Sequence, residues 1–320
     1  MSGSAGASSE FHSTGVRGEW PSHTGNWGRW DNDRGTLNLI DAAAVLRGVA
    51  AVRTGAVVTC GRAIDPDNGT DQWTESPAST QTMLRADSTG FEQGQMTQVS
   101  YDDWTVRTHG MTNTHIDALC HIGYRGRTFG GHPFDDVVSM AEGAKKFDAT
   151  ELTGIVTRGM LIDVPRNRGA LVEPGTPVTP DDLAPILEQI QPGDAAVIRT
   201  GCQWRKILSG PADTQHGLGL TQKWPGLRAE TVDALASADV SLIATDAPGD
   251  TIPYEHRDLV HSPVHVLSEV FYGIPLIHNA DFEDLADQCD ESGGIAFLFC
   301  VAPLLLPGGT GSLVSPLAVV

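Results

Sequence analysis

Apolar and polar positions in the second half of the chain form short runs that predict strands and helices in turn. Apolar runs predict buried strands at residues 159–164, 195–199, 240–245, 274–277 and 295–301. Helices are predicted at 179–191, 228–238 and 282–289, and the first opens where Thr179 can cap it and Pro180 fits its first turn. Alternation of strand and helix predicts the α/β class, although it does not fix the order of the strands.

The first half carries weaker signals. We predict a helix at 42–52 and strands at 56–60 and 96–101. Residues 27–38 combine aromatic, glycine and charged residues, which predicts an ordered loop. Residues 66–77 are predicted to form a polar loop that is long enough to cover a pocket. The Ser/Gly/Ala-rich start predicts a mobile tail at 1–25, followed by a single domain at 26–320.

Charge and composition narrow the class of partner. A hydrophobic content of 40% supports a packed core, and a formal net charge of −19 disfavours nucleic acid and anionic membrane surfaces as partners. The apolar run at 295–306 is too short to span a bilayer and is interrupted by Pro303. Five cysteines without a C-x-x-C pair indicate reduced thiols, so we expect a cytoplasmic protein that acts on a small molecule.

Metal-ligating side chains are densest at residues 109–121, which hold three histidines and one aspartate. If 113–117 is extended, His115 and Asp117 project from the same face with Cα atoms roughly 6.6 Å apart. An imidazole and a carboxylate at that spacing can converge on Zn²⁺ or Mn²⁺. A bend after Ala118 would add His121, whose imidazole suits proton transfer near neutral pH.

His109 is harder to place, because a straight strand would hold it about 20 Å from His115. It reaches the same cation only if the chain turns at Gly110, which glycine permits. A histidine taken alone is more often a satisfied core or surface residue than a ligand. Only the accumulation of His109, His115 and His121 around Asp117 makes a metal site as plausible as that simpler alternative.

The segment Thr114-His115-Ile116-Asp117-Ala118-Leu119-Cys120-His121 resembles the H-x-G-T-H-x-D-A-x-x-H signature of the cyclase family of metal-dependent hydrolases. The resemblance extends to residues 27–38, 273–277 and 302–312. It implies a mixed-sheet α/β domain of the swivelling β/β/α type that assembles as a homodimer or homotetramer. It further implies that His115 and Asp117 bind the metal and that His121 is the catalytic acid/base.

The sequence departs from this signature at two positions. Met111 stands where the family has its first histidine, and Asn113 replaces the glycine. The resemblance therefore implies one divalent cation per subunit, with His109 as a shifted first ligand. His265 and His278 are further candidates to complete its shell, and His261 is a weaker one.

The predicted function is metal-dependent hydrolysis of a small amide, cyclic amide or lactone by water that the metal activates, with His121 moving the proton. Four residues are candidates for substrate contact: Trp73, Trp104, Phe129 and Arg199. Asp246, like Arg199, ends an apolar strand and could orient a substrate. Packing or ion pairing is the alternative role for each of them.

Two alternatives stay open. A lyase or cyclase of secondary metabolism could use the same cation for dehydration or ring closure. A non-catalytic binding protein on the same fold is the other alternative, and Met111 and His278 motivate it. The sequence contains neither the G-x-S-x-G of serine hydrolases nor the H-E-x-x-H of zinc proteases.

Overall fold

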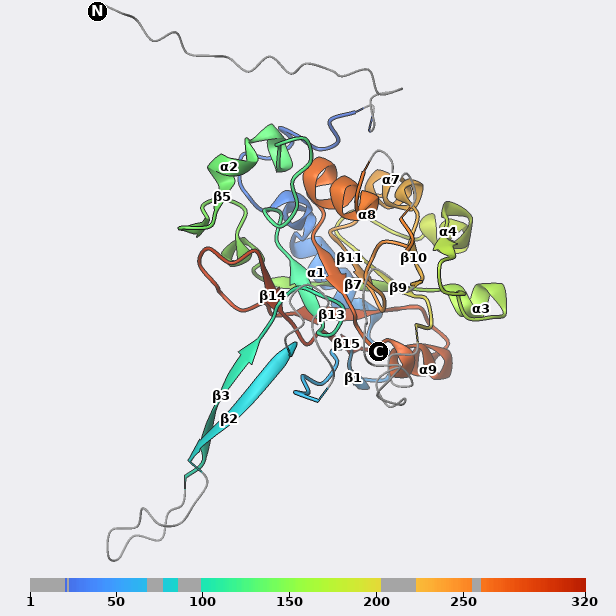
Figure 1. Ribbon diagram of the computed structural model, residues 1–320. Helices are drawn as coiled ribbons and strands as arrows, with labels where there is room; N and C mark the ends of the chain where they lie inside the picture. Colours follow the sequence, from blue (N-terminus) through green and yellow to red (C-terminus); the bar gives the residue numbers. More distant parts are fainter. Residues whose placement is uncertain (1–20, 22, 68–76, 86–98, 203–222, 255–259) are drawn as a thin grey trace, which may run out of the picture.

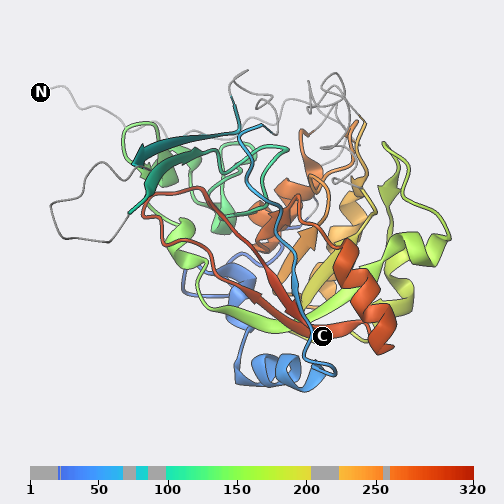
Figure 2. The same cartoon turned by 90° about the horizontal axis from the view of Figure 1, so that it is seen from below.

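A mixed sheet runs through the middle of the molecule, with helices packed on both of its faces (Figures 1 and 2). The computed structural model describes residues 21, 23–67, 77–85, 99–202, 223–254 and 260–320. These residues form one α/β domain, which confirms the predicted fold class. The predicted tail and most of the predicted polar loop at 66–77 lie outside the described residues.

Nine strands make up this sheet within the described residues. Four central strands, β7, β9, β11 and β12, run parallel, and the strands outside them pair antiparallel. In spatial order the strands are β1 (Val57–Thr59), β15 (Leu317–Val319), β13 (Ala296–Val301), β7 (Ile155–Asp163), β9 (Ala195–Arg199), β11 (Leu242–Thr245), β12 (Leu276–His278), β4 (His115–Asp117) and β14 (Gly311–Leu313).

Alternate residues of the central strands enter two separate cores, because successive side chains point to opposite faces. On β9, Val197 belongs to the core shared with α9 (Glu283–Ser292). Its neighbour Ile198 belongs to the core under α4 (Pro180–Leu187) and α7 (Ala229–Ser237). Strands buried on both faces read as continuous apolar runs, which explains why the sequence revealed β9 and β11 so clearly.

The remaining helical elements are short and connect or cover the strands. α1 (Ala42–Ala51) packs against β7 and β13. Three 3₁₀ turns are present in the described chain, η1 (Gly35–Leu39), η2 (Phe129–Gly131) and η3 (Ala149–Glu151), together with the short helices α2 (Phe134–Val137), α3 (Val164–Arg168) and α8 (Pro263–His265). α8 continues into a π-helical segment, η4 (Val266–Tyr272). In the part of the chain that is described, no helix combines the length and apolar character that a membrane crossing requires.

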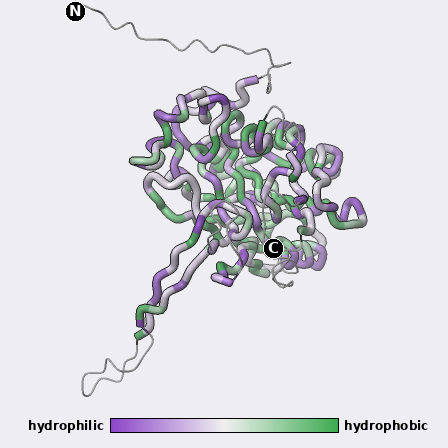
Figure 3. Tube along the Cα trace, in the orientation of Figure 1, coloured by the Kyte–Doolittle hydropathy of each residue, from purple (hydrophilic) through white to green (hydrophobic). Residues whose placement is uncertain are grey.

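A two-stranded hairpin, β2 (Ser79–Arg85) and β3 (Tyr101–Val106), projects from the body of the molecule (Figure 1). Its side chains are largely exposed, including Met83 at 50%, Tyr101 at 51% and Trp104 at 43%. Hydrophobic positions gather inside the body but also lie toward the outer end of this hairpin (Figure 3). Two smaller ribbons, β5 (Val138–Ser139) with β6 (Gly143–Ala144) and β8 (Pro177–Val178) with β10 (Gly226–Leu227), complete the sheet structure described.

Most predicted elements coincide with observed ones, and the differences have local causes. β7 begins four residues before its predicted start. Thr157 and Arg158 are polar and therefore interrupt the apolar run that predicts the strand, but both side chains have polar partners inside the fold. Thr157 donates to the Gly193 carbonyl, and Arg158 pairs with the fully buried Asp194. The helix predicted to reach residue 191 ends at Leu187. Most of the strand predicted at 96–101 lies outside the described residues, and β3 begins at Tyr101.

The packing of α1 on β7 leads to a test with Gly48. A Cβ at Gly48 would lie 2.7 Å from the Thr157 backbone, so Gly48→Ala must lift the helix from the sheet. We expect the free energy of unfolding to fall by about 1–3 kcal/mol, although alanine is the better helix former. Urea unfolding measures it, with Leu46→Ala as the control, since Leu46 is 65% exposed on the same helix. Equal stability of the two variants would contradict this packing.

Candidate metal centre

Strand β4 presents the two central candidate ligands, His115 and Asp117, to the same face. Ile116 between them points into the core and is fully buried. His115 and Asp117 are themselves only 3% and 1% exposed. On the neighbouring strand β12, His278 lies directly opposite His115, and their ring centroids are 5.3 Å apart. The pleat of β4 and its pairing with β12 therefore bring two imidazoles and a carboxylate together.

His109 reaches the same carboxylate through a turn at Gly110, where φ is +126°. The Asn279 amide donates to the carbonyls of Gly110 and Asn113 and holds this turn in place. His109 Nδ1 then lies 2.8 Å from Asp117 Oδ1. The predicted turn is confirmed.

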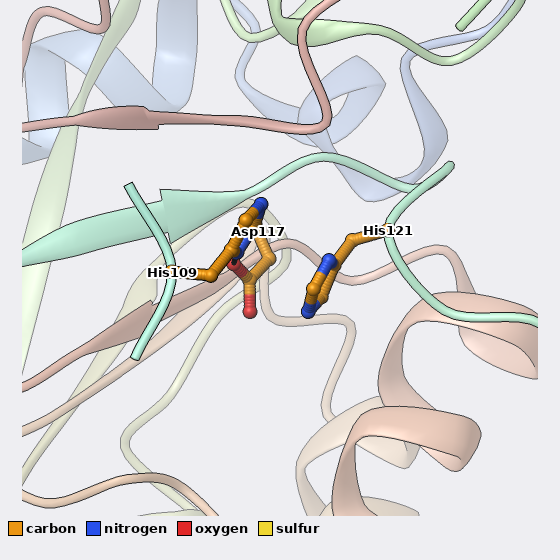
Figure 4. A group of neighbouring side chains, drawn as sticks. All are labelled: His109, Asp117 and His121. Atoms are coloured by element: carbon orange, nitrogen blue, oxygen red, sulfur yellow. Dashed lines mark ion pairs between the residues drawn. The ribbon is translucent and has the colours of Figure 1, made fainter. Parts of the chain in front are cut away.

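His121 joins the group because the chain bends directly after β4, where the His121 amide donates to the Ala118 carbonyl. Its ring stacks on that of His109 with centroids 3.8 Å apart (Figure 4). Figure 4 shows the two imidazoles face to face, with Asp117 beside them. One ligand atom each from His109, Asp117 and His121 lie within 4.8 Å of one another.

A second group of ligand atoms surrounds the other oxygen of Asp117. Asp117 Oδ2 lies 2.9 Å from His278 Nε2 and 3.7 Å from His265 Nε2. His265 stands at the end of α8, and its Nδ1 is hydrogen-bonded to the Asp250 carboxylate. A carboxylate behind a histidine in this way orients the other ring nitrogen toward a metal. Asp117 is thus shared by two groups of imidazoles.

Burial keeps most of these imidazoles neutral. It lowers the pKa of both His115 and His121 to about 3, and it also lowers the pKa of His278. His265 differs. Burial is the largest single effect on its pKa and lowers it, but the hydrogen bond to Asp250 and the charges of Asp250 and Asp117 together raise the pKa. Neutral imidazoles have free lone pairs, which is the state that metal ligation requires.

Asp117 is the charged centre of this arrangement. Burial disfavours its ionised form, but the surrounding imidazoles, that of His121 foremost, hold its pKa well below the usual range. A second buried carboxyl, Glu269 on η4, has its pKa raised well above the usual range by burial and by the nearby Asp117. Burial therefore favours the protonated, uncharged form of Glu269.

The orientation of the candidate ligand atoms, and the hydrogen bonds that they lack, suit a bound cation. A carbonyl can only accept, so His115 Nδ1 donates to the Asn113 carbonyl and its Nε2 carries a lone pair. That lone pair faces Asp117 Oδ1 at 3.5 Å, which is repulsive without a cation between them. Asp117 Oδ1 and His109 Nδ1 are buried and make no hydrogen bond of acceptable geometry. Buried polar atoms need a partner, and imidazole nitrogen with carboxylate oxygen suits a divalent metal.

A cavity of about 280 Å³ opens onto these ligands. Part of its wall is apolar, formed by Met111, Ile122, Pro248 and Ile252. Tyr254, His261 and Ser262 supply polar groups to the same wall. Met111 therefore lines the cavity, whereas His109 is the residue of this segment that contacts Asp117.

The structure does not bring the described candidates for substrate contact to this cavity. Trp104 is exposed on the hairpin, where its indole donates to Asp102. Phe129 is buried in the main core against Phe147. Arg199 is held by ion pairs, which suits a structural role. Trp73 lies outside the described residues.

Arg199 forms its two ion pairs with Asp163 and Glu283, each at 2.8 Å. Asp246 accepts backbone hydrogen bonds from Thr200 and Gly201 and so anchors the chain after β9. The charged groups of Arg199 and Asp246 therefore both take part in structural contacts. Sequence reasoning missed Asp250 and Tyr254, because neither belongs to a motif or to an apolar run.

Comparison with known proteins identifies the family of this chain. Residues 40–249 match the family model Cyclase, described as "Putative cyclase". A crystal structure of a novel cyclase superposes with a TM-score of 0.80 at 26% identity, covering 92% of this chain and 97% of that chain. No curated protein matches this sequence.

Two isatin hydrolase A structures share the fold at 19% identity and a TM-score of 0.58. The protein from Labrenzia aggregata, bound to benzyl benzoate, covers 86% of this chain and 96% of its own. The one from Ralstonia solanacearum covers 87% and 94%. From the family match over residues 40–249, this chain belongs to the cyclase family.

Proposed function

We propose that the protein hydrolyses a small amide, cyclic amide or lactone with a divalent cation, Zn²⁺ or Mn²⁺, held at Asp117. The observation that carries the proposal is the buried Asp117 carboxylate, which is surrounded by imidazole nitrogens and opens onto a cavity. His109, His115, His265 and His278 are the proposed ligands beside it. When bound, the cation supplies Lewis acidity and lowers the pKa of water toward about 7.

His121 is the proposed acid/base. Its depressed pKa keeps the imidazole neutral, so it can take a proton from the attacking water. The water oxygen bonds to the carbonyl carbon, the C–N or C–O bond breaks, and His121 returns the proton to the leaving nitrogen or oxygen. The products are a carboxylic acid and an amine or alcohol, which remain joined when the substrate is cyclic.

The alternatives use the same site differently. A lyase or cyclase would remove water rather than add it, so the mass of the product separates the two reactions. A non-catalytic binding protein was suggested by Met111 and His278. His109 and His278 both lie beside Asp117, which indicates a complete set of ligands. This favours an enzyme over a non-catalytic binding protein.

The number of cations per subunit and the oligomeric state of the protein remain predictions. One cation per subunit was predicted, yet Asp117 faces two groups of imidazoles, and metal analysis decides between one and two. The predicted homodimer or homotetramer is supported by the exposed apolar side chains of the β2–β3 hairpin, which a partner subunit could cover.

We expect Asp117→Ala to abolish metal binding, because this carboxylate is shared by both groups of ligands. Inductively coupled plasma mass spectrometry on purified protein measures the metal per chain. Asp102→Ala on the exposed hairpin is the matched control and should retain the wild-type content. Full occupancy in Asp117→Ala would refute the site.

We expect His121→Ala to keep its metal and to lose about 10²–10⁴-fold in kcat, because only proton transfer is removed. Activity toward a cyclic amide or lactone panel and metal content are measured together. His132→Ala, outside the cavity, is the control. Loss of metal from His121→Ala would make this residue a ligand instead, as its distance to Asp117 allows.

Chelator-treated, metal-free protein should lose the contribution of His115 and His121 to its stability as the pH falls from 7 to 5. The unfolded chain protonates both imidazoles near pH 6.5, whereas their folded pKa is about 3. Each group then contributes a loss of up to about 1.4 kcal/mol per pH unit below 6.5. The raised pKa values of His265, Glu269 and Asp246 act in the opposite direction, so the contribution is read from the difference between the wild type and a variant.

Urea unfolding of the metal-free protein at pH 7, 6 and 5 tests this dependence. The double variant His115→Gln/His121→Gln should show a shallower slope than the wild type. Parallel slopes for the two proteins would show that these imidazoles are not buried neutral.

A further inference from the structure

Residues 25–36, which we call the N-terminal segment, take no part in the mechanism above. They pack along the C-terminal end of η4, the π-helical segment that continues from α8 and His265. The last carbonyls of a helix have no partner within it and need donors from elsewhere. Here the N-terminal segment supplies donors to four consecutive carbonyls. They are Trp27 Nε1 to Val270 at 2.6 Å, the Asn26 amide to Phe271 at 2.9 Å, Asn26 Nδ2 to Tyr272 at 2.8 Å and the Thr36 amide to Gly273 at 2.8 Å.

Two glycines allow the N-terminal segment to approach the backbone of η4 this closely. Both have positive φ, +59° at Gly25 and +54° at Gly35. A Cβ at Gly25 would lie 2.3 Å from the Phe271 carbonyl oxygen, and one at Gly35 would lie 2.1 Å from that of Gly273. Trp27 also stacks on Phe271, with ring centroids 5.5 Å apart and 6° between the planes. The contact is therefore built by backbone conformation and close packing.

The helix requires support at both ends because of its geometry. Its first turn carries His265, and there Asp250 accepts from the Val264 amide and is hydrogen-bonded to His265 Nδ1. A π-helical segment is rarer than an α-helical one and is often found at functional sites. A return to α-helical partners would rotate one end of the segment relative to the other. Asp250 holds the first end, and the N-terminal segment holds the second.

The N-terminal segment also supports the bend that carries His121. Ile122, the next residue, packs against an apolar cluster built mainly from η4, and so does Trp27. The rings of His121 and His265 lie near each other at the cavity, with centroids 6.4 Å apart. Both histidines are thus carried by parts of the chain that rest on the same N-terminal segment.

We propose that the N-terminal segment is a positioning clamp, which holds η4 and the bend after β4 so that His265 and His121 face the cavity at Asp117. This inference rests on the proposed function, which places a cation there. Asn26 and Trp27 are positioning residues that act through the backbone of η4, since neither is among the described residues that line the cavity. Loss of a residue that orients a metal ligand typically weakens metal binding by about 10–100-fold.

Metal affinity tests the clamp on the full-length protein. Asn26→Ala/Trp27→Phe removes the two side-chain donors and keeps an aromatic ring beside Phe271. We expect the Kd for Zn²⁺ or Mn²⁺, measured by competition with a chromophoric chelator, to rise about tenfold. Gly48→Ala, whose loss of stability arises between α1 and β7, is the control and should keep the wild-type Kd. An unchanged Kd in the double variant would overturn the proposal.

Trp27→Phe alone is the milder variant, for use if the double variant does not fold. It removes one hydrogen bond, so the Kd for the metal should rise about threefold. An unchanged Kd in this folded variant counts equally against the clamp.

A double-mutant cycle separates positioning from general destabilisation. In the background His265→Gln, the ligand that the clamp positions is gone. Adding Asn26→Ala/Trp27→Phe should then weaken metal binding by no more than about threefold, because the two changes act through one interaction. The same tenfold loss in both backgrounds would show that the segment does not act through His265, and the proposal would fail.

Hydrogen exchange of the metal-free protein gives a readout that does not depend on the cation. The amides of residues 263–274 should exchange about fivefold faster in Asn26→Ala/Trp27→Phe than in Gly48→Ala, because the lost hydrogen bonds let the end of η4 open locally. Equal exchange in the two variants would contradict the clamp. If exchange differs as expected but the wild type binds neither Zn²⁺ nor Mn²⁺, the clamp stands and the proposed function fails.

Discussion

The burial of one carboxylate, Asp117, is the constraint on which the rest of the site depends. Asp117 is 1% exposed on β4, and the surrounding imidazoles favour its ionised form against the cost of burial. His109 Nδ1 lies 2.8 Å from its Oδ1, and His278 Nε2 lies 2.9 Å from its Oδ2. A buried carboxylate with imidazole nitrogens on both of its oxygens suits a divalent cation, which is where the proposed function places one.

The supporting interactions come from several distant parts of the chain. Asn279 fixes the turn that delivers His109, and Asp250 fixes both His265 and the turn that carries Ser262. A single buried carboxylate, Asp250, therefore connects the candidate ligand His265 to the wall of the cavity. Such shared support links the geometry of the candidate ligands to that of the cavity.

How much of this could be predicted from the sequence depends on how local each signal was. The alternation of His115 and Asp117 and the glycine at 110 predicted the first group of ligands, since a two-residue period and a turn are local properties. His265 and His278 entered only through family resemblance. Their approach to Asp117 depends on the pairing of β12 with β4, a contact between residues far apart in the chain.

Sequence reasoning was less successful where the polarity of a residue does not indicate whether its side chain is buried or paired. Phe129 and Arg199 looked available to a substrate, yet one packs in the core and the other is held by two carboxylates. The start of β7 was hidden because Thr157 and Arg158 find partners that no pattern of hydropathy reveals. Tyr254 and Ser262 lie in irregular chain, where spacing carries no information about neighbours.

The position of β14 has a consequence for how the site forms during folding. This strand pairs with β4 on the side opposite β12, and Gly311 lies directly across from Asp117. A Cβ at Gly311 would stand 2.8 Å from the His109 ring, so the strand has no room for a side chain at this point. β14 follows β4 by about 190 residues, so the two strands meet only when distant parts of the chain have come together. Until β14 pairs with β4, the side chains around Asp117 lack the strand that encloses them.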